Sequence, residues 1–390
     1  MKESLIALVI CTVGELVTGI VFGVSSSYLI ILPALMLIIP PSLGLRGNIY
    51  SSLSSKISTY LHLGRIQPSL GSIRKISSEI QLSMILLLVM SFLIGVLAFI
   101  AYSAVKNRFT MIDFVNLADI TLISVILSAL FLCPMTIVLT VESYRFGWNP
   151  DNLTAPIVFL LGDIITLPLI FVAFDITYLL SNLLRILVLF AILISVAIIF
   201  FLYYNKRNSK NVFAIKESFY ALFLCLLLQF MAGFILMQEI PSFIKFSGLL
   251  TVLPAFLSVG GSIGGILVAR FSTLLHLGII EPAVKPKRDI LISLSLMHIL
   301  SFVIFFILGI LAYTLNLILK LSSPPLINTL TMIVFAGQVL TFFLNVISYY
   351  LSIFSFKFGF NPDNIGIPIL SALMDYTGTF CFVLALRLFI

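Results

Sequence analysis

Apolar segments long enough to cross a membrane follow one another along almost the whole chain. A spanning helix needs about 20 apolar residues, since each residue advances it about 1.5 Å through a hydrocarbon core about 30 Å thick. Eleven segments meet that length, with short polar stretches between them. The sequence therefore predicts an all-α integral membrane protein with eleven transmembrane helices. They cover residues 4–25, 28–62, 80–104, 112–142, 153–178, 183–204, 217–239, 247–276, 290–314, 324–354 and 365–388.

The composition leaves too little charge for a surface that faces water. Hydrophobic residues make up 61% of the 390-residue chain and charged residues 9%, and the mean hydropathy is +1.22. A soluble protein covers its exterior with far more charge, so lipid must be the solvent for most of this surface. The formal net charge of +7 comes from short basic clusters between apolar segments. That distribution is typical of membrane topology signals and not of nucleic-acid binding.

The first segment and the cysteines carry little functional information. Residues 4–25 exceed the apolar core of a signal peptide, so we expect a retained span with no soluble domain before it. Each cysteine stands alone in an apolar stretch, without a CxxC or His/Cys cluster, and is expected to be a buried small hydrophobic residue. The four are Cys11, Cys133, Cys225 and Cys381.

The sequence contains an internal duplication. Residues 56–68 match residues 270–282 at 8 of 13 positions, with an offset of 214. Residues 144–152 match residues 356–364 at 6 of 9 positions, with an offset of 212, and both copies contain Asn-Pro-Asp-Asn. The same offset aligns an aspartate in the apolar segment that follows each copy. Chance similarity between apolar sequences does not produce this pattern, so the duplication is a strong signal.

The duplication predicts two five-helix domains joined by one extra helix. The first five segments form one copy and the last five the other, which leaves residues 183–204 without a counterpart. This additional crossing gives both copies the same orientation. We therefore expect parallel repeats related by a pseudo-two-fold axis along the membrane normal. The predicted domains are residues 1–180 and 212–390, with residues 181–211 as the linking transmembrane helix and a cytoplasmic loop.

Basic residues predict the orientation of the chain. With the N-terminus in the cytoplasm and the C-terminus outside, thirteen lysines and arginines fall on the cytoplasmic side and five on the other. A ten-span alternative would place the basic cluster Lys285–Arg288 outside. We therefore predict a multi-pass protein of the cell membrane. Four basic residues within assigned spans enter neither tally: Arg46, Lys56, Arg185 and Arg270.

Asp163 and Asp375 are predicted to lie near the middle of the bilayer. Each follows the aspartate of its Asn-Pro-Asp-Asn turn by twelve residues, which places it about 16 Å into a core about 30 Å thick. A carboxylate there costs about 2.5–3.5 kcal/mol, and such residues usually mark an ion path. The structural alternatives are a protonated, hydrogen-bonded acid or an ion pair. Two carboxylates that converge between the repeats predict a divalent-cation site, whereas the turns are interpreted as helix caps.

Proline and glycine clusters occupy equivalent places in the second and eighth segments. Residues 40–48 and residues 254–262 hold these clusters, and both segments are longer than a simple span needs. Such clusters predict a broken or distorted helix whose freed carbonyls can face an ion path. Tight helix packing through small residues is the alternative interpretation.

These motifs resemble a known family. Residues 40–59, with their Gly-Leu-Arg-Gly-Asn core, resemble the second membrane helix of the MgtE family of magnesium channels. They are closest to the related solute carriers that fuse two such membrane domains. Residues 149–163 and 361–375 resemble the fifth helix of that family. The resemblance covers nearly the whole chain.

The resemblance implies a pore between two five-helix domains, lined by helices two and five. It makes Asp163 and Asp375 the carboxylates that recognise magnesium. The helix-two Gly-Asn pair implies an ion pathway past Gly47 and Asn48, and past the matching Gly261 and Ser262 in the second half, where the asparagine is missing. The nucleotide- and magnesium-sensing domains of bacterial members are expected to be absent.

The predicted function is transport of a divalent cation, most plausibly Mg²⁺, held largely hydrated because it gives up water reluctantly. Mn²⁺ and Co²⁺ remain open, because oxygen ligands suit several hard ions. The alternative is a secondary carrier of another solute, coupled to protons or sodium. A membrane-embedded enzyme is disfavoured, since the acids are single and deep. We expect no cofactor and no nucleic acid, a divalent cation and membrane lipid as partners, and a monomer sufficient as a pseudo-dimer.

Overall fold

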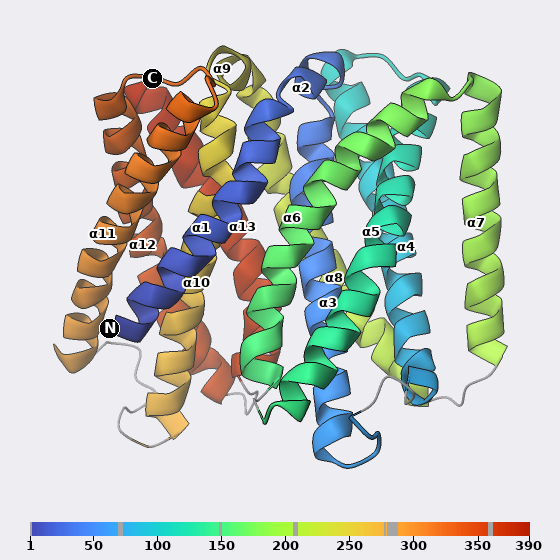
Figure 1. The fold of residues 1–390 in the computed structure, drawn as a ribbon, viewed down its shortest axis with the longest axis horizontal. Helices are drawn as coiled ribbons and strands as arrows, with labels where there is room; N and C mark the ends of the chain where they lie inside the picture. The colour runs from blue at the N-terminus through green and yellow to red at the C-terminus, as the bar shows by residue number, and fades with distance from the viewer. Residues whose placement is uncertain are drawn as a thin grey trace. The chain divides into compact units, whose positions relative to one another are not determined.

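The structure is a computed structural model that describes residues 2–68, 73–147, 150–205, 210–276, 278, 288–357 and 362–390. All regular secondary structure in these residues is α-helical (Figure 1). Each of the eleven predicted segments coincides with one long helix, and two short helices precede the second and the eighth. The helices are α1 (Lys2–Val24), α2 (Ser27–Ile31), α3 (Leu35–His62), α4 (Ile73–Lys106), α5 (Met111–Arg145), α6 (Pro150–Leu179), α7 (Asn182–Asn205), α8 (Lys210–Gln238), α9 (Ile240–Lys245), α10 (Gly248–His276), α11 (Arg288–Ile318), α12 (Leu326–Lys357) and α13 (Pro362–Phe389).

Nine helices in the described part of the chain are both long and apolar enough to cross a membrane. The side chains of α1 are described only from Thr12. The segment Thr12–Val24 is apolar but too short to count as a membrane-crossing helix. α3 is long enough but is not among these nine helices, and it contains Arg46, Lys56 and several serines. The chain is therefore a multi-pass membrane protein, as predicted, whereas the number of eleven crossings stays a prediction.

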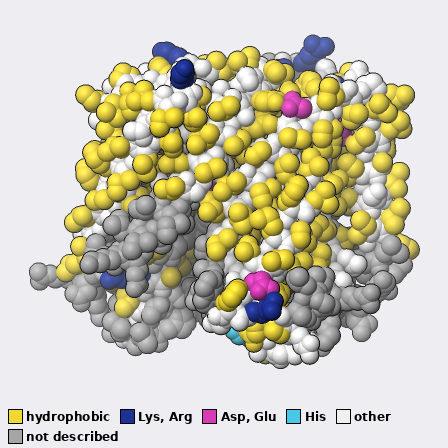
Figure 2. All heavy atoms as spheres, viewed as in Figure 1, with side chains coloured by type: hydrophobic (Ala, Val, Ile, Leu, Met, Phe, Trp, Pro, Cys, Tyr) yellow, Lys and Arg dark blue, Asp and Glu magenta, His cyan; other side chains and the backbone are white. Residues whose placement is uncertain are grey.

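The exterior of the helices suits a lipid environment. α7 exposes apolar side chains along its length, with Leu183 68%, Phe190 59% and Phe201 62% exposed. In Figure 2, hydrophobic side chains cover the middle of the visible face, and charged side chains lie toward its upper and lower margins. A soluble monomer rarely exposes so much contiguous apolar surface. Lipid contact accounts for it.

The described helices form two compact units. Unit 2 comprises residues 34–230, and unit 1 comprises residues 1–33 together with residues 231–390. Within unit 1, α1 packs along α10, so the N-terminal helix lies among helices of the second half of the chain (Figure 1). Within unit 2, α3 packs against α4, α5 and α6. The boundaries at residues 180 and 211 concern the sequence repeats and stay a prediction.

The predicted break at the proline and glycine clusters is wrong. α3 runs without interruption through Pro40 and Pro41, and α10 runs through Pro254. A membrane helix tolerates proline because neighbouring helices and hydroxyl side chains satisfy the backbone groups that the ring sets free. The over-long second segment is divided earlier, between α2 and α3, where Pro33 lies between the two helices.

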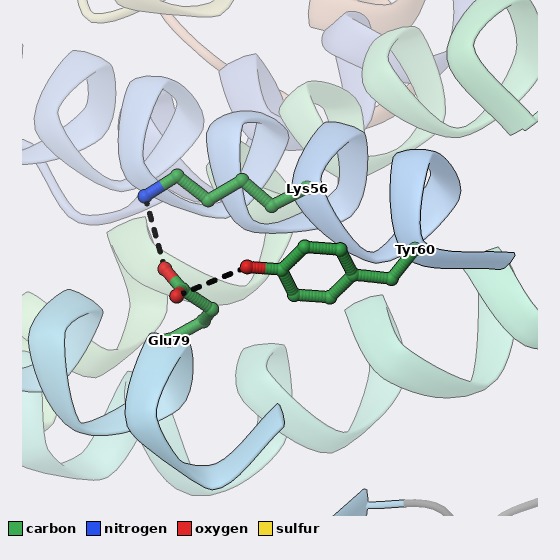
Figure 3. Close-up of polar contacts among 3 residues, drawn as sticks. All are labelled: Lys56, Tyr60 and Glu79. Carbon is green, nitrogen blue, oxygen red and sulfur yellow. Dashed lines mark hydrogen bonds and ion pairs between the residues drawn. The ribbon is translucent and has the colours of Figure 1, made fainter. Parts of the chain in front are cut away.

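A polar contact joins the end of α3 to the start of α4. Lys56 Nζ lies 3.2 Å from Glu79 Oε2, and the Tyr60 hydroxyl donates to Glu79 Oε1 at 3.3 Å (Figure 3). The Glu79 side chain is 11% exposed, and that of Lys56 is 39% exposed. Lys56 lies within a predicted span, and its pairing with Glu79 removes the cost of an isolated charge at this depth.

The α1–α10 contact depends on a glycine. A Cβ atom on Gly19 would overlap the backbone carbonyl of Thr251 in α10, and one on Gly23 would lie 2.5 Å from the Thr251 hydroxyl oxygen. Small residues let two membrane helices approach until their backbones touch, which maximises van der Waals contact where lipid offers no hydrophobic driving force. Gly162 in α6 is a contrasting helical glycine, since no described residue lies within 4 Å of a Cβ built on it.

These contacts give opposite expectations for two Gly→Ala substitutions. Gly19→Ala should destabilise the protein by about 1–3 kcal/mol, because the α1 and α10 backbones must separate. Gly162→Ala should leave it unchanged or stabilise it by up to about 1 kcal/mol through helix propensity. Thermal unfolding of the purified protein in detergent measures both. Equal melting temperatures for the two variants would contradict the close α1–α10 approach.

Candidate functional site

In unit 2 the site is built on the pairing of α3 with α6. The Ser54 hydroxyl lies 2.6 Å from that of Thr154, and further along the helices Gly47 packs directly against the ring of Phe159. Asp163 follows Phe159 by four residues, so it lies on the same face of α6, one turn further on. Its side chain is half-buried. The pairing therefore brings Asp163 close to the glycine-rich part of α3.

Arg46 is the main residue that the sequence interpretation missed. Its side chain is 1% exposed and about 16 Å along α3 from Leu35. Nε donates to Ser128 Oγ at 2.8 Å and Nη2 to Ser124 Oγ at 2.9 Å, both on α5. Nη1 donates to the Ser42 backbone oxygen at 3.0 Å. An arginine in an apolar segment was visible in the sequence, but only the fold shows which groups surround it.

The charge of Asp163 acts on the Arg46 guanidinium. In a low-dielectric interior this interaction extends further than in water, since little solvent screens it. Arg46 therefore offsets part of the negative charge that Asp163 brings to unit 2. The sequence interpretation kept an ion pair as an alternative for this acid, but it did not identify Arg46 as the nearby cation.

Asn48 is buried without the partners that an amide needs. It is 6% exposed, and neither Nδ2 nor Oδ1 has a hydrogen-bond partner among the described residues. The hydroxyl of Thr166, three residues after Asp163 on α6, is also buried and unpartnered there. Such groups cost about 1–3 kcal/mol each unless water or an ion meets them. They support a hydrated path along α3 and α6.

In unit 1 the corresponding site lies between α10 and α13. Gly264 packs against Met374, and Leu257 packs against Gly378. Asp375 lies between these two contacts along α13 and is therefore level with Gly261 and Ser262, which lie between them along α10. All three are half-buried. Among the described residues, nothing lies within 4 Å of a Cβ built on Gly261, so no described neighbour fills this side of the helix.

Within each unit the site residues therefore lie on two helices that pack together, α3 with α6 and α10 with α13, and the two units differ. The convergence of Asp163 and Asp375 stays a prediction. Offsets of 214 and 212 place Gly260 at the position of Arg46 and Ser371 at that of Phe159. Unit 1 has no arginine and no ring at these two places, and its glycine face is open. The Asn-Pro-Asp-Asn turns cannot be compared, because Asn149, Asn361 and the side chains that follow them lie outside the described residues.

Asp119 is a third deep carboxylate that the sequence interpretation did not identify. It is fully buried in α5, and neither of its oxygens has a hydrogen-bond partner in the described part of the chain. Arg185 of α7 lies within electrostatic range, but its Nη1 donates to Asn116 Oδ1, one turn away, at 2.8 Å. α7 also packs on α5 through Leu189, which contacts a cluster that includes Val115.

Cysteine and metal-ligand chemistry do not contribute to the site in the described residues. Cys133, Cys225 and Cys381 are buried, as predicted, and form no disulfide in the described part of the chain, whereas the Cys11 side chain lies outside the description. No group of three or more His, Cys, Asp and Glu side chains comes together in the residues that were searched. In the described residues a cation would meet few protein charges, and water and neutral oxygen atoms would complete its shell.

Long apolar helices that carry carboxylates, an arginine and unpartnered polar groups in their middle define a polytopic membrane transport protein. The profile of the MgtE family, described as "Divalent cation transporter", matches residues 39–173 and residues 253–385. These two regions make up more than half of the chain. The chain belongs to the MgtE family.

Relatives with curated names agree with this assignment. Solute carrier family 41 member 3 of Mus musculus is 27% identical over 243 residues, which are 62% of this chain and 50% of that protein. Solute carrier family 41 member 2 of Homo sapiens is 23% identical over 372 residues, 88% of this chain and 62% of that protein. The chain thus spans about half to two thirds of the length of these relatives. No solved structure matches it.

The unpartnered Asp119 gives a stability prediction. Asp119→Asn should raise the melting temperature, by the equivalent of about 1–3 kcal/mol, because an amide carries no charge to desolvate. Asp113→Asn on the same helix is the matched control. Asp113 accepts a hydrogen bond from Thr110 in the first turn of α5, so its neutralisation should lower stability by about 0.3–1 kcal/mol. Thermal unfolding tests both, and a lower melting temperature for Asp119→Asn would contradict the burial argument.

Proposed function

We propose that the chain transports a divalent cation, first of all Mg²⁺, across the membrane. The observation that carries the proposal is a half-buried carboxylate in the middle of α6 and another in the middle of α13, in regions matched by a divalent cation transporter family. Carboxylates at this depth are rare, and they usually mark an ion path. Asp163 and Asp375 supply the charge of the pathway, and Gly47, Asn48, Gly261 and Ser262 line it.

The ion travels with much of its water. Mg²⁺ prefers six oxygen ligands and keeps several waters, so one carboxylate in each half is sufficient for outer contacts. The unpartnered amide of Asn48 and the open face at Gly261 suit water-mediated contact with a hydrated ion. The function is transport and not catalysis, and Mg²⁺ is the substrate and not a resident cofactor.

The chain is organised as two parallel five-helix repeats joined by α7, with the N-terminus in the cytoplasm and the C-terminus outside. The two matched regions support this, since their starts differ by 214 residues and their ends by 212. Glycine contacts support it as well. Gly95 packs against Ala118 of α5, and Gly309, at an offset of 214, packs against Leu330 of α12, at an offset of 212.

The two halves contribute unequally to cation recognition. Asp163 shares unit 2 with the buried guanidinium of Arg46, whereas Gly260 takes the place of that arginine in unit 1. We expect a divalent ion to experience a weakened attraction from Asp163, because the positive charge of Arg46 repels the ion.

Neutralisation of the carboxylates tests the proposal. Asp375→Asn should reduce Mg²⁺ flux by on the order of 100-fold and Asp163→Asn by about tenfold, because Arg46 already weakens the second charge. The double variant should show no flux above background. Asp175→Asn, three turns beyond Asp163 on α6 and exposed, is the control and should transport normally. Uptake into proteoliposomes loaded with a Mg²⁺ indicator gives the rates.

The uptake assay also separates the two transport mechanisms. Measured with and without sodium and proton gradients, it distinguishes passive cation flux from a coupled carrier. Normal Mg²⁺ transport by the double Asn variant would exclude this role for the two carboxylates.

Arg46 gives a second functional prediction. Arg46→Met removes the countercharge and should lower the KM for Mg²⁺ by about tenfold, since less repulsion opposes the ion. Arg46→Lys keeps the charge and should leave the KM close to that of the unmodified protein. Initial rates of uptake over a range of Mg²⁺ concentrations measure both constants. Identical KM values for the Met and Lys variants would show that the charge of Arg46 does not reach the ion.

A further inference from the structure

A groove opens between α11 and α12 in unit 1, and Asp375 of α13 is not among the residues that line it. It encloses about 300 Å³, within the range of small-molecule sites. Apolar residues at its opening face outward, with Leu291 49%, Phe342 57% and Val346 41% exposed. The groove is lined by Leu291, Leu294, Ser295, His298, Phe342, Asn345, Val346, Tyr349 and Tyr350. Its wall is therefore mostly apolar and aromatic, and it also contains Ser295, His298, Asn345 and the two tyrosine hydroxyls.

Hydrogen bonds determine which nitrogen of His298 carries the proton. Gln338 Nε2 donates to the His298 backbone oxygen at 3.2 Å and to Ser301 Oγ at 2.9 Å, which identifies it as the amide nitrogen. Gln338 Oε1 lies 3.1 Å from His298 Nδ1 and must accept a proton from it. Nε2 of the neutral imidazole therefore has a free lone pair and can accept a hydrogen bond.

Asn345 offers a second acceptor. Its Nδ2 donates to the Leu294 backbone oxygen at 3.3 Å, which fixes the orientation of the amide. The side chain is 4% exposed, and no described residue donates to Oδ1. Ser295 donates its hydroxyl proton to the Leu291 backbone oxygen at 2.9 Å, so its oxygen also faces the groove as an acceptor. Among the described residues, the buried Asn345 Oδ1 is therefore an acceptor that no donor meets.

We propose that this groove binds a neutral membrane lipid through its hydroxyl group. A hydroxyl supplies the missing donor to Asn345 Oδ1 or His298 Nε2, and the apolar body of the lipid covers Leu291, Phe342 and Val346. Anionic groups are disfavoured because Asn345 Oδ1 is an acceptor and because a charge loses its hydration at this depth. Ammonium headgroups are disfavoured because a charge loses its hydration at this depth. Lone waters do not fill the space, since one water occupies about 30 Å³ and needs two or more polar partners.

The depth of the groove suits a lipid alcohol. His298 lies eight residues from the start of the apolar span Ile290–Ile318, and Asn345 lies nine residues from the end of the span Leu326–Phe354. These separations correspond to about 12–14 Å along each helix. Spans of 29 residues exceed a 30 Å hydrocarbon core by about 13 Å, so both side chains lie several ångströms below its boundary. Uncharged lipid hydroxyls reside near that level.

The first half of the chain lacks these acceptors. Offsets of 214 and 212 place Met84 at the position of His298, Ile126 at that of Gln338 and Cys133 at that of Asn345. None of these side chains is a strong acceptor. The groove is therefore a feature of the second half only, and the first half supplies conservative replacements with which to test it.

Photolabelling in nanodiscs tests the proposal with the full chain. The probes are a photoreactive, alkyne-tagged sterol, a diacylglycerol with the same tag, and the methyl ether of each, which has the same shape but no donor. Mass spectrometry locates the labelled peptides. We expect a free alcohol to label residues 291–298 and 342–350 about tenfold more than its methyl ether, as one hydrogen bond predicts. The sterol and diacylglycerol arms identify which lipid class binds.

Variants check that the labelling depends on the acceptors. The double variant His298→Met with Asn345→Cys should reduce labelling by the alcohol to the level of the ether. Ile299→Met, on the exposed face of α11 outside the groove, is the control and should label normally. Equal labelling by alcohol and ether in the unmodified protein would overturn the proposal, whatever the stability of the variants. Labelling spread evenly over the exposed apolar helices would overturn it as well.

Discussion

The hydrocarbon layer contains no water, so a polar group of this chain needs a protein partner or a place where water enters. Most hydroxyls meet the requirement locally. Thr136, Thr140 and Thr177 each donate to the backbone oxygen four residues earlier in their own helix. Arg46 meets it with serines of α5. Against this background, the unpartnered Asn48 stands out, and its position on α3 beside α6 coincides with the proposed pathway.

The same constraint explains how far the sequence predicts the fold. Each helix must satisfy its own backbone and present about 20 apolar residues, so length and hydropathy locate all the long helices. Length and hydropathy do not predict which helices pack together, because the apolar surfaces of different helices are chemically alike. The packing of α1 on α10 depends on the absence of a side chain at Gly19, opposite Thr251. A glycine in an apolar segment does not identify its neighbour.

The sequence predicts the site residues that are rare in membrane helices. It does not predict the residues whose role depends on contacts with another helix. Asp163 and Asp375 stand out because acids are expensive in the bilayer, and duplicated spacing links them. Arg46 was equally rare, but its effect depends on a partner on another helix, which no spacing within α3 reveals. Asp119 has no counterpart in the second half, where Thr331 takes its place at an offset of 212. A search based on the duplication therefore missed it.

Fusion of two copies into one chain permits an arrangement that a symmetric dimer cannot have. In a homodimer each substitution occurs twice about the axis, so an arginine beside one acid also lies beside the other. In this chain the second repeat has Gly260 at the position of Arg46 and Ser371 at the position of Phe159. One half therefore has an arginine near its carboxylate and a ring in its helix contact, while the other half has glycine and serine at these places. In the proposed pathway the positive charge of Arg46 weakens the attraction for a divalent ion, which favours release as well as entry, because conduction requires that binding not be too tight.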